Sequence, residues 1–166
     1  MTETLKDIMA FDEAHYFDIG TAEKPKIELG GVITQLDESS NPTESEKQYI
    51  HQKTKTTKVT GFADEFPITM DMVKGDAVFE YFYDIFRNRK TGTEAQVIHY
   101  IVELWNKTAE NTYKCRKQVQ TVSIDTKTAN PGEQINISGT LKAVSDFVDG
   151  TFNVETKQFT ETPEMA

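Results

Sequence analysis

Three histidines and a single cysteine are the side chains in this sequence best suited to metal binding or nucleophilic chemistry. His99 and Glu103 share a face of an expected strand, but at about 3.3 Å per residue they lie roughly 13 Å apart, too far to bind one metal ion. We therefore expect His99 to be a half-buried histidine beside solvent. Cys115 lies between Lys114 and Arg116, whose side chains point to the opposite face of a strand, so we expect Cys115 to be a small core residue.

Other catalytic patterns are absent from the sequence. It contains no G-x-S-x-G elbow and no glycine-rich loop leading into a helix that could hold a phosphate. Its carboxylates are numerous but scattered, so no general-acid and general-base pair stands out. The sequence therefore predicts a protein that is not an enzyme and that holds no metal and no cofactor.

Composition narrows the class of protein further. The chain has 166 residues, with 18 basic and 27 acidic side chains and a net charge of -9, which argues against a broad basic face that grips nucleic acid. One cysteine allows no internal disulfide, and no apolar run reaches the roughly 18 residues of a membrane span. With 22 Thr, 10 Phe and 6 Tyr, the composition favours strands. We expect one acidic, β-rich domain over residues 1–166 that folds in a cytosol.

One helix is predicted over residues 76–90. Asp76 can cap its start, and Gly92 can end it. Five apolar residues recur at helical spacing and form an expected core face: Val78, Phe79, Phe82, Ile85 and Phe86.

The remaining elements are expected to be strands. Alternating apolar residues place them at 15–19, 26–29, 31–36, 61–72, 95–106, 112–126, 133–145 and 151–159. A change of apolar phase in the 112–126 strand predicts a β-bulge near Gln120 and Thr121. Turns are expected at 107–111, at 130–132 and at Asp149-Gly150. Residues 1–14 read as a loose N-terminal arm and 160–166 as a frayed tail. The fold class is mainly β, a β-sandwich or partial barrel with one flanking helix.

The segment at 45–60, SEKQYIHQKTKTTKVT, alternates Thr and Lys as an extended strand would, yet residues 52–58 offer no apolar side chain to either face. A surface loop is one interpretation. The other is a projecting hairpin arm over residues 37–60 that pairs with another subunit. The arm has an acidic end and a basic end, which suits head-to-tail contact with an identical copy better than contact with DNA. The residues expected to make that contact are Asp37, Glu38, Glu44, Glu46, Lys47, Tyr49, His51, Lys53, Lys55 and Lys58.

Three stretches carry a resemblance to a known family: QYIHQKTKTTKVTGF at 48–62, GDAVFEYFYDIFRNRKTG at 75–92 and ISGTLKAVSDFVDGTFNVETKQFT at 137–160. Together they resemble a phage tail tube (major tail) protein of the long, non-contractile type, over roughly residues 49–160. The resemblance implies a structural virion protein that forms hexameric rings stacked into a hollow tail tube. Arms would join neighbouring rings, and DNA would pass through without being bound.

The same resemblance implies where the protein works and with what. Its partners would be other copies of itself and the tail tape measure, distal tail and terminator proteins, with no membrane partner. It would assemble in the host bacterial cytoplasm and reside in the virion tail. The polar side chains of the strand near 140 would close the ring and face the lumen: Asn136, Ser138, Thr140 and Lys142. We expect acids to outnumber bases on that wall, since a negative wall repels the duplex.

A β-sandwich binding or adhesion module of a tail or cell-wall protein is the alternative. Such modules present clustered exposed aromatics, whereas the Phe and Tyr residues here fall mostly on core phases. The two hypotheses differ in what the arm does. If the arm serves assembly, deleting residues 41–55 leaves a folded domain that no longer polymerises.

Overall fold

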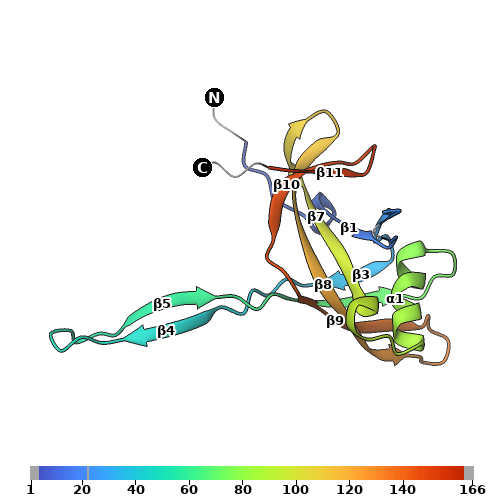
Figure 1. Cartoon of the computed structure of the whole chain (residues 1–166). Helices are drawn as coiled ribbons and strands as arrows, with labels where there is room; N and C mark the ends of the chain where they lie inside the picture. The colour runs from blue at the N-terminus through green and yellow to red at the C-terminus, as the bar shows by residue number, and fades with distance from the viewer. Residues whose placement is uncertain (1–3, 22, 163–166) are drawn as a thin grey trace.

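Figure 1 shows the computed structural model, which describes residues 4–21 and 23–162. A body of antiparallel strands holds one helix against its side, and a two-stranded arm projects from the body. The body strands are β1 (Glu13–Asp18), β2 (Ile27–Leu29), β3 (Ile33–Leu36), β6 (Glu65–Asp71), β7 (Gln96–Ala109), β8 (Thr112–Thr128), β9 (Asn136–Ala143), β10 (Val148–Asn153) and β11 (Gln158–Glu161). Two short 3-10 turns, η1 (Ala10–Asp12) and η2 (Gly92–Ala95), precede β1 and β7.

The main sheet curls into a partial barrel. Its strand order is β2-β1-β7-β8-β9-β6-β3, and the β10–β11 hairpin branches from β8. β2 and β3 lie at opposite ends of this order although only residues 30–32 separate them in the chain, so the sheet must bend round on itself. The predicted fold class, mainly β with one flanking helix, is confirmed.

Two hydrophobic cores lie on opposite faces of this sheet. Phe17 and Ile101 point into the larger core, which the helix shares, while their neighbours Tyr16 and Tyr100 point into a smaller core with Phe152 of β10. Side chains alternate between the faces of a strand, so β1 and β7 supply both cores at once. Between these layers the central strands are covered on both sides.

The two cores also explain the apolar pattern of β8, where the predicted bulge at Gln120 and Thr121 is wrong. The register between β7 and β8 runs unbroken from Gln96 opposite Thr121 to Glu103 opposite Lys114. Early in β8, Cys115 packs in the smaller core; later, Val122 packs in the larger one. The apolar phase changes because the packed face changes, while the backbone of the strand stays regular there.

The helix α1 (Ala77–Arg87) begins where the sequence indicates. The Asp76 carboxylate accepts a hydrogen bond from the Phe79 backbone N–H at 2.9 Å, which confirms the predicted cap. Of the predicted core face, Val78, Phe79, Phe82 and Ile85 are buried and Phe86 is half-buried. The predicted end at Gly92 is wrong. The helix stops at Arg87, and Arg89 adopts a positive φ of 49°, which turns the chain away earlier.

The predicted turn at Asp149-Gly150 is also wrong. Both residues lie inside β10, where Gly150 pairs with Cys115 on one side and Glu161 on the other. A side chain at Gly150 would collide with the backbone carbonyl of Thr160, so the glycine permits close strand approach instead of a turn. The chain reverses at residues 154–157, with Lys157 at a positive φ of 56°.

Some expected boundaries also move. The turn at 107–111 narrows to residues 110–111, because β7 continues to Ala109. Residues 160–161 of the expected tail belong to β11, and 163–166 lie outside the described residues. Within the described part of the chain, the helix is too short and too polar to cross a membrane.

Candidate assembly surfaces

The arm is a separate two-stranded sheet. β4 (Thr43–Lys47) and β5 (Thr56–Gly61) pair antiparallel, from Thr43 opposite Gly61 to Lys47 opposite Thr56. In the described residues neither strand joins the main sheet, and neither contributes a side chain to the two cores. The segment over 45–60, whose alternation resembles an extended strand, forms the two strands of a hairpin with a reversal at residues 48–55, and the hairpin extends away from the body (Figure 1).

The arm is attached through its base. The Asn41 side chain donates to the Ala63 carbonyl at 3.0 Å, and the Ala63 N–H donates to the Ser40 carbonyl at 2.9 Å. Two residues expected in the arm lie on the body instead. The Asp37 N–H donates to the Pro67 carbonyl at 3.0 Å. Glu38 accepts two hydrogen bonds from the Arg116 guanidinium of β8, at 2.8 and 3.1 Å.

Charges on the arm partly neutralise each other. Lys55 and Glu46 form an ion pair at 3.2 Å across the hairpin, with both side chains more than half exposed. Such exposed pairs stabilise a protein by about 0–1 kcal/mol, so this pair sets little of the arm's stability. Glu44, Lys53 and Lys58 are exposed and have no ion-pair partner among the described residues.

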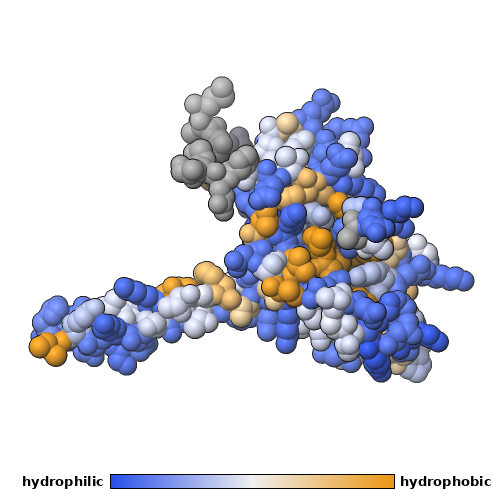
Figure 2. Space-filling view, in the orientation of Figure 1, coloured by the Kyte–Doolittle hydropathy of each residue, from blue (hydrophilic) through white to orange (hydrophobic). Residues whose placement is uncertain are grey.

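The arm tip carries an apolar residue into solvent. Tyr49 stacks on His51 with 6.2 Å between ring centres, and Lys47 Nζ lies 5.0 Å from the centre of the Tyr49 ring. Between them Ile50 is fully exposed, at 107% of the reference area. Figure 2 shows this apolar surface at the far end of a mostly polar arm. The sequence analysis missed Ile50 as a contact residue, although a lone isoleucine in a polar run was the available signal.

Further apolar surface lies on the body. Phe62 at the foot of the arm is 66% exposed, and it lines a hollow together with Val144. A second region, here called the N-terminal groove, lies where residues 8–11 run past β1 and β3. Its exposed apolar side chains are Ile8, Met9, Phe11, Leu29 and Trp105. Figure 2 shows apolar patches on the body face as well as at the arm. Exposed apolar clusters of this kind mark contact surfaces.

The polar face of β9 lies where alternation places it. Ile137 and Leu141 are wholly buried, while the four predicted lumen residues Asn136, Ser138, Thr140 and Lys142 point to the other face. On that face they pair with four positions of β6: Asp71, Thr69, Pro67 and Glu65. This strip therefore carries two acids and one base.

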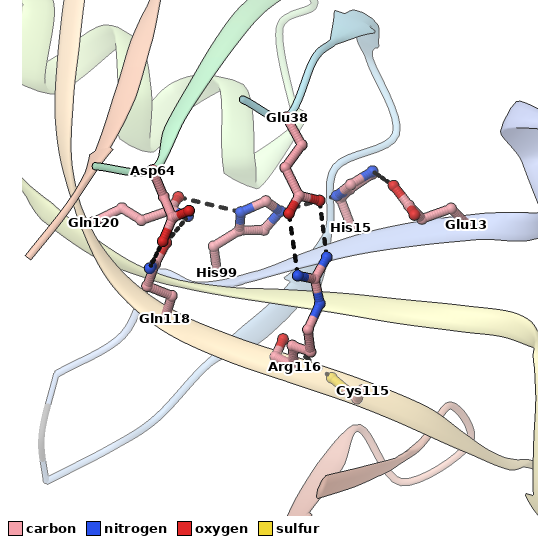
Figure 3. Close-up of polar contacts among 9 residues, drawn as sticks. All are labelled: Glu13, His15, Glu38, Asp64, His99, Cys115, Arg116, Gln118 and Gln120. Atoms are coloured by element: carbon pink, nitrogen blue, oxygen red, sulfur yellow. Dashed lines mark hydrogen bonds and ion pairs between the residues drawn. The ribbon is translucent and has the colours of Figure 1, made fainter. Parts of the chain in front are cut away.

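The histidine that the sequence analysis placed beside solvent is deeply buried, so that expectation is wrong. His99 has no exposed surface and stacks on Phe17, with 4.6 Å between ring centres. Burial, together with the charge of His15, lowers its pKa well below the ordinary value. Figure 3 shows its hydrogen bonds, with His15 Nδ1 at 2.9 Å and Gln120 Oε1 at 3.1 Å.

Cys115 is the core residue that the sequence predicts. It is 1% exposed, and burial raises the pKa of its thiol to about 12, so it stays protonated and unreactive. His51 lies on the arm tip, far along the chain from the other histidines. Within residues 4–21 and 23–162, no three His, Cys, Asp or Glu side chains converge as metal ligands.

Several solved structures share this architecture. The chain matches the SPP1 tail tube, solved by solid-state NMR and cryo-EM, with a TM-score of 0.67 and 17% identity over 86% of this chain and 78% of that one. The chain has the fold of a tail-tube protein. The tail of an empty gene transfer agent particle, refined with C6 symmetry, matches at a TM-score of 0.61 and 8% identity, over 85% of this chain and 97% of that one.

The tail-tube fold also extends to a third assembly. A chain of the anti-feeding prophage baseplate matches at a TM-score of 0.54 and 8% identity, covering 92% of this chain and 99% of that one. No protein-family model and no curated protein sequence matches. These likenesses establish the fold.

Proposed function

We propose that this protein is the repeating structural subunit of a phage tail tube, and that its arm joins neighbouring subunits. The observation that carries the proposal is the hairpin β4–β5. It ends in an isoleucine that packs against none of the residues that the structure describes, and it projects from a body with the tail-tube fold. An arm of this kind gains its buried surface from another copy.

Assembly into a ring would also cover the unpaired edges of the main sheet. β2 and β3 end the main sheet, and among the described residues their outer edges have no strand partner. Free edges invite pairing with another chain, so closure into a ring removes them. Six-fold symmetry, as in the gene transfer agent tail, is the arrangement we propose for that ring.

Stacked rings would leave a central channel for DNA in the virion tail. The strip of β9 and β6 carries two acids and one base and would line it, so the duplex slides without being held. Assembly would take place in the host cytoplasm, together with the tape measure, distal tail and terminator proteins.

Replacing residues 44–60 with an Asn-Gly turn tests the role of the arm. Thr43 and Gly61 face each other across the hairpin, so a two-residue turn can join them, and the Asn41 bond to Ala63 is kept. The cut avoids residues 41–43, which hold the base. We expect an unchanged fold by circular dichroism and no tubes by negative-stain microscopy.

Mixing the armless and wild-type proteins supplies the control. An armless subunit keeps the surface that would receive a neighbour's arm but has no arm with which to bind the following subunit. Small amounts of armless protein, fewer than one per wild-type subunit, should therefore shorten wild-type tubes. If the armless protein forms tubes of normal length, the arm does not join subunits. If wild-type protein stays monomeric even at high concentration and with tail-initiating proteins added, the tail-tube role itself is contradicted. That result would favour the alternative of a β-sandwich adhesion module.

A further inference from the structure

The tip of the arm is a closed turn that carries one apolar side chain outward. The Gln52 N–H donates to the Tyr49 carbonyl at 3.0 Å, and the Gln52 side chain accepts from the Tyr49 N–H at 3.0 Å and donates to Thr56 at 3.3 Å. These bonds place Ile50 at the corner of the turn, where Gly, Pro, Asn, Asp and Ser are the usual residues. Because this isoleucine packs against none of the described residues, its apolar surface is available to a partner.

The outer part of the arm is also the basic part of an acidic protein. Residues 47–60 contain four of the chain's 18 basic side chains and none of its 27 acidic ones. Two of these lysines, Lys47 and Lys53, flank the tip turn, and both are exposed. Such a tip is attracted to an acidic surface. Its own body is out of reach, because the arm extends away from it (Figure 1), so that surface belongs to another molecule.

The N-terminal groove offers the apolar surface that this tip lacks. Its volume of about 850 Å³ lies within the range that holds a drug-sized ligand, so it has room for the tip turn. The η1 turn lines part of it and is held by two hydrogen bonds of 2.9 Å between Met9 and Asp12. Five large apolar side chains in the groove are 38–75% exposed: Ile8, Met9, Phe11, Leu29 and Trp105.

The charge of the groove also complements the tip. The described residues that line it include the carboxylate of Glu13 and no lysine or arginine. The Glu13 side chain is 35% exposed, with one oxygen 3.0 Å from His15. A second acid, Glu103, lies directly opposite Glu13 in the β1–β7 register. A lysine arriving with the tip would therefore meet acids with no competing lysine or arginine in the lining.

The hollow beside Phe62 is less complementary to the tip. Its four acids are accompanied by two bases, Arg116 and Lys142, which repel the lysines of the tip. Glu38 already accepts two hydrogen bonds from Arg116. Glu65 lies opposite Lys142 in the β6–β9 register. The hollow also presents two large exposed apolar side chains among the described residues, against five in the groove.

We propose that the arm tip of one copy docks in the N-terminal groove of another copy. Ile50 lies among the apolar side chains of the groove, and the lysines that flank it face Glu13. This inference rests on the proposed function, because it names the surface that receives the arm. Each copy carries one tip and one groove, so the contact is head-to-tail and continues from copy to copy. Hydrogen bonds within the chain already shape both surfaces, which lowers the cost of ordering them on contact.

A double-mutant cycle on assembly tests the contact. Phe11 is 75% exposed and belongs to neither core, so Phe11→Ala should leave urea unfolding unchanged. It should raise the protein concentration needed for tubes about tenfold. If Phe11 and Ile50 touch, Phe11→Ala combined with Ile50→Ala should fall short of the product of the two single effects by about threefold or more. Val144→Ala, in the hollow beside Phe62, is the matched control, and its effect should simply multiply with that of Ile50→Ala.

The outcomes separate this inference from the proposed function. If tubes form and the effects of Phe11→Ala and Ile50→Ala multiply, docking in the groove is refuted while the tail-tube role stands. A shortfall between Val144→Ala and Ile50→Ala would place the tip in the hollow instead. If the wild type forms no tubes even with tail-initiating proteins added, the tail-tube role fails and docking in the groove falls with it.

Photo-cross-linking locates the tip without altering the groove. A benzophenone amino acid at position 50 of the full chain, activated in assembled protein, should link to peptides from residues 8–16, 29–36 or 104–113, which line the groove. Mixing isotope-labelled and unlabelled subunits distinguishes links between copies from links within one chain. Links to residues 61–65 or 142–147, to the same chain, or to a different protein would overturn the proposal.

Discussion

Replacing Ile50 with alanine separates assembly from folding. The side chain is fully exposed in the single chain, so the substitution should change the free energy of unfolding by less than about 0.5 kcal/mol. In a tube the tip would be buried against a neighbour. Three carbons at about 0.8 kcal/mol each then cost about 2.4 kcal/mol per contact, which raises the subunit concentration needed for tubes about 50-fold. Pelleting of tubes over a concentration series measures this.

Ile137→Ala is the matched control, because the same side chain is wholly buried in β9. It should lower the free energy of unfolding by about 2–5 kcal/mol, measured by urea denaturation of unassembled protein. Two results would refute the reasoning about Ile50. Tubes that form at the wild-type concentration would mean that the tip stays in water. A loss of unfolding free energy comparable to that of Ile137→Ala would mean that the tip packs on its own chain.

Three further predictions concern the body, and two of them include a paired control substitution. Gly139→Ala places a Cβ against the Ser123 carbonyl and should cost about 1–3 kcal/mol in urea unfolding, whereas Gly61→Ala meets nothing within 4 Å and should be nearly neutral; equal effects would contradict the close approach of β8 and β9. Asp76→Ala should cost about 1 kcal/mol by the same assay, and Asp76→Asn should restore most of it, because both side chains can accept the capping bond. The lowered pKa of His99 makes stability pH-dependent: the unfolded chain takes up a proton below its ordinary pKa of 6.5 and the folded chain does not, so stability is full above that pH and falls as the pH drops. His99→Gln cannot titrate and should flatten the fall in melting temperature between pH 7 and 5; an unchanged slope would assign the acid sensitivity elsewhere.

Local signals in the sequence were enough to predict the features that depend on local chemistry. A cap at Asp76 and an apolar stripe predict the helix, because both signals lie within a few helical turns of one another in the sequence. The sequence also predicts that residues 52–58 do not pack on the body, because the segment has no apolar side chain to bury there. The tip residue Ile50 stands out in the sequence as a lone isoleucine in a polar run, but its full exposure depends on the reversal at residues 48–55, whose position the alternation does not give.

The remaining features depend on contacts between distant segments. His99 is buried because His15, 84 residues earlier, supplies a hydrogen bond inside the barrel, and no window of sequence contains both. The Asp149-Gly150 pair carries the strongest short-range turn signal, yet packing of β11 uses the same glycine inside a strand. In β8, the apolar residues switch from one face to the other because the strand packs on two cores. This switch has the same sequence pattern as a bulge, since periodicity shows which face is packed and not whether the backbone is regular.

The arm differs from the body in where its stability comes from. A two-stranded hairpin is marginal in water, and this one adds a single exposed ion pair and contributes to neither core. We therefore expect the body to fold without the arm, and the arm to become firmly ordered only where a neighbouring subunit covers it in the proposed tube. Ordering it costs conformational entropy, which one tip contact offsets only in part. On the proposed function, a free pair of subunits would be weakly held, whereas a subunit added to an existing ring would gain arm and edge contacts together. On this reasoning, growth from a template is favoured over spontaneous pairing, and the exposed tip stays compatible with a soluble subunit until a template is present.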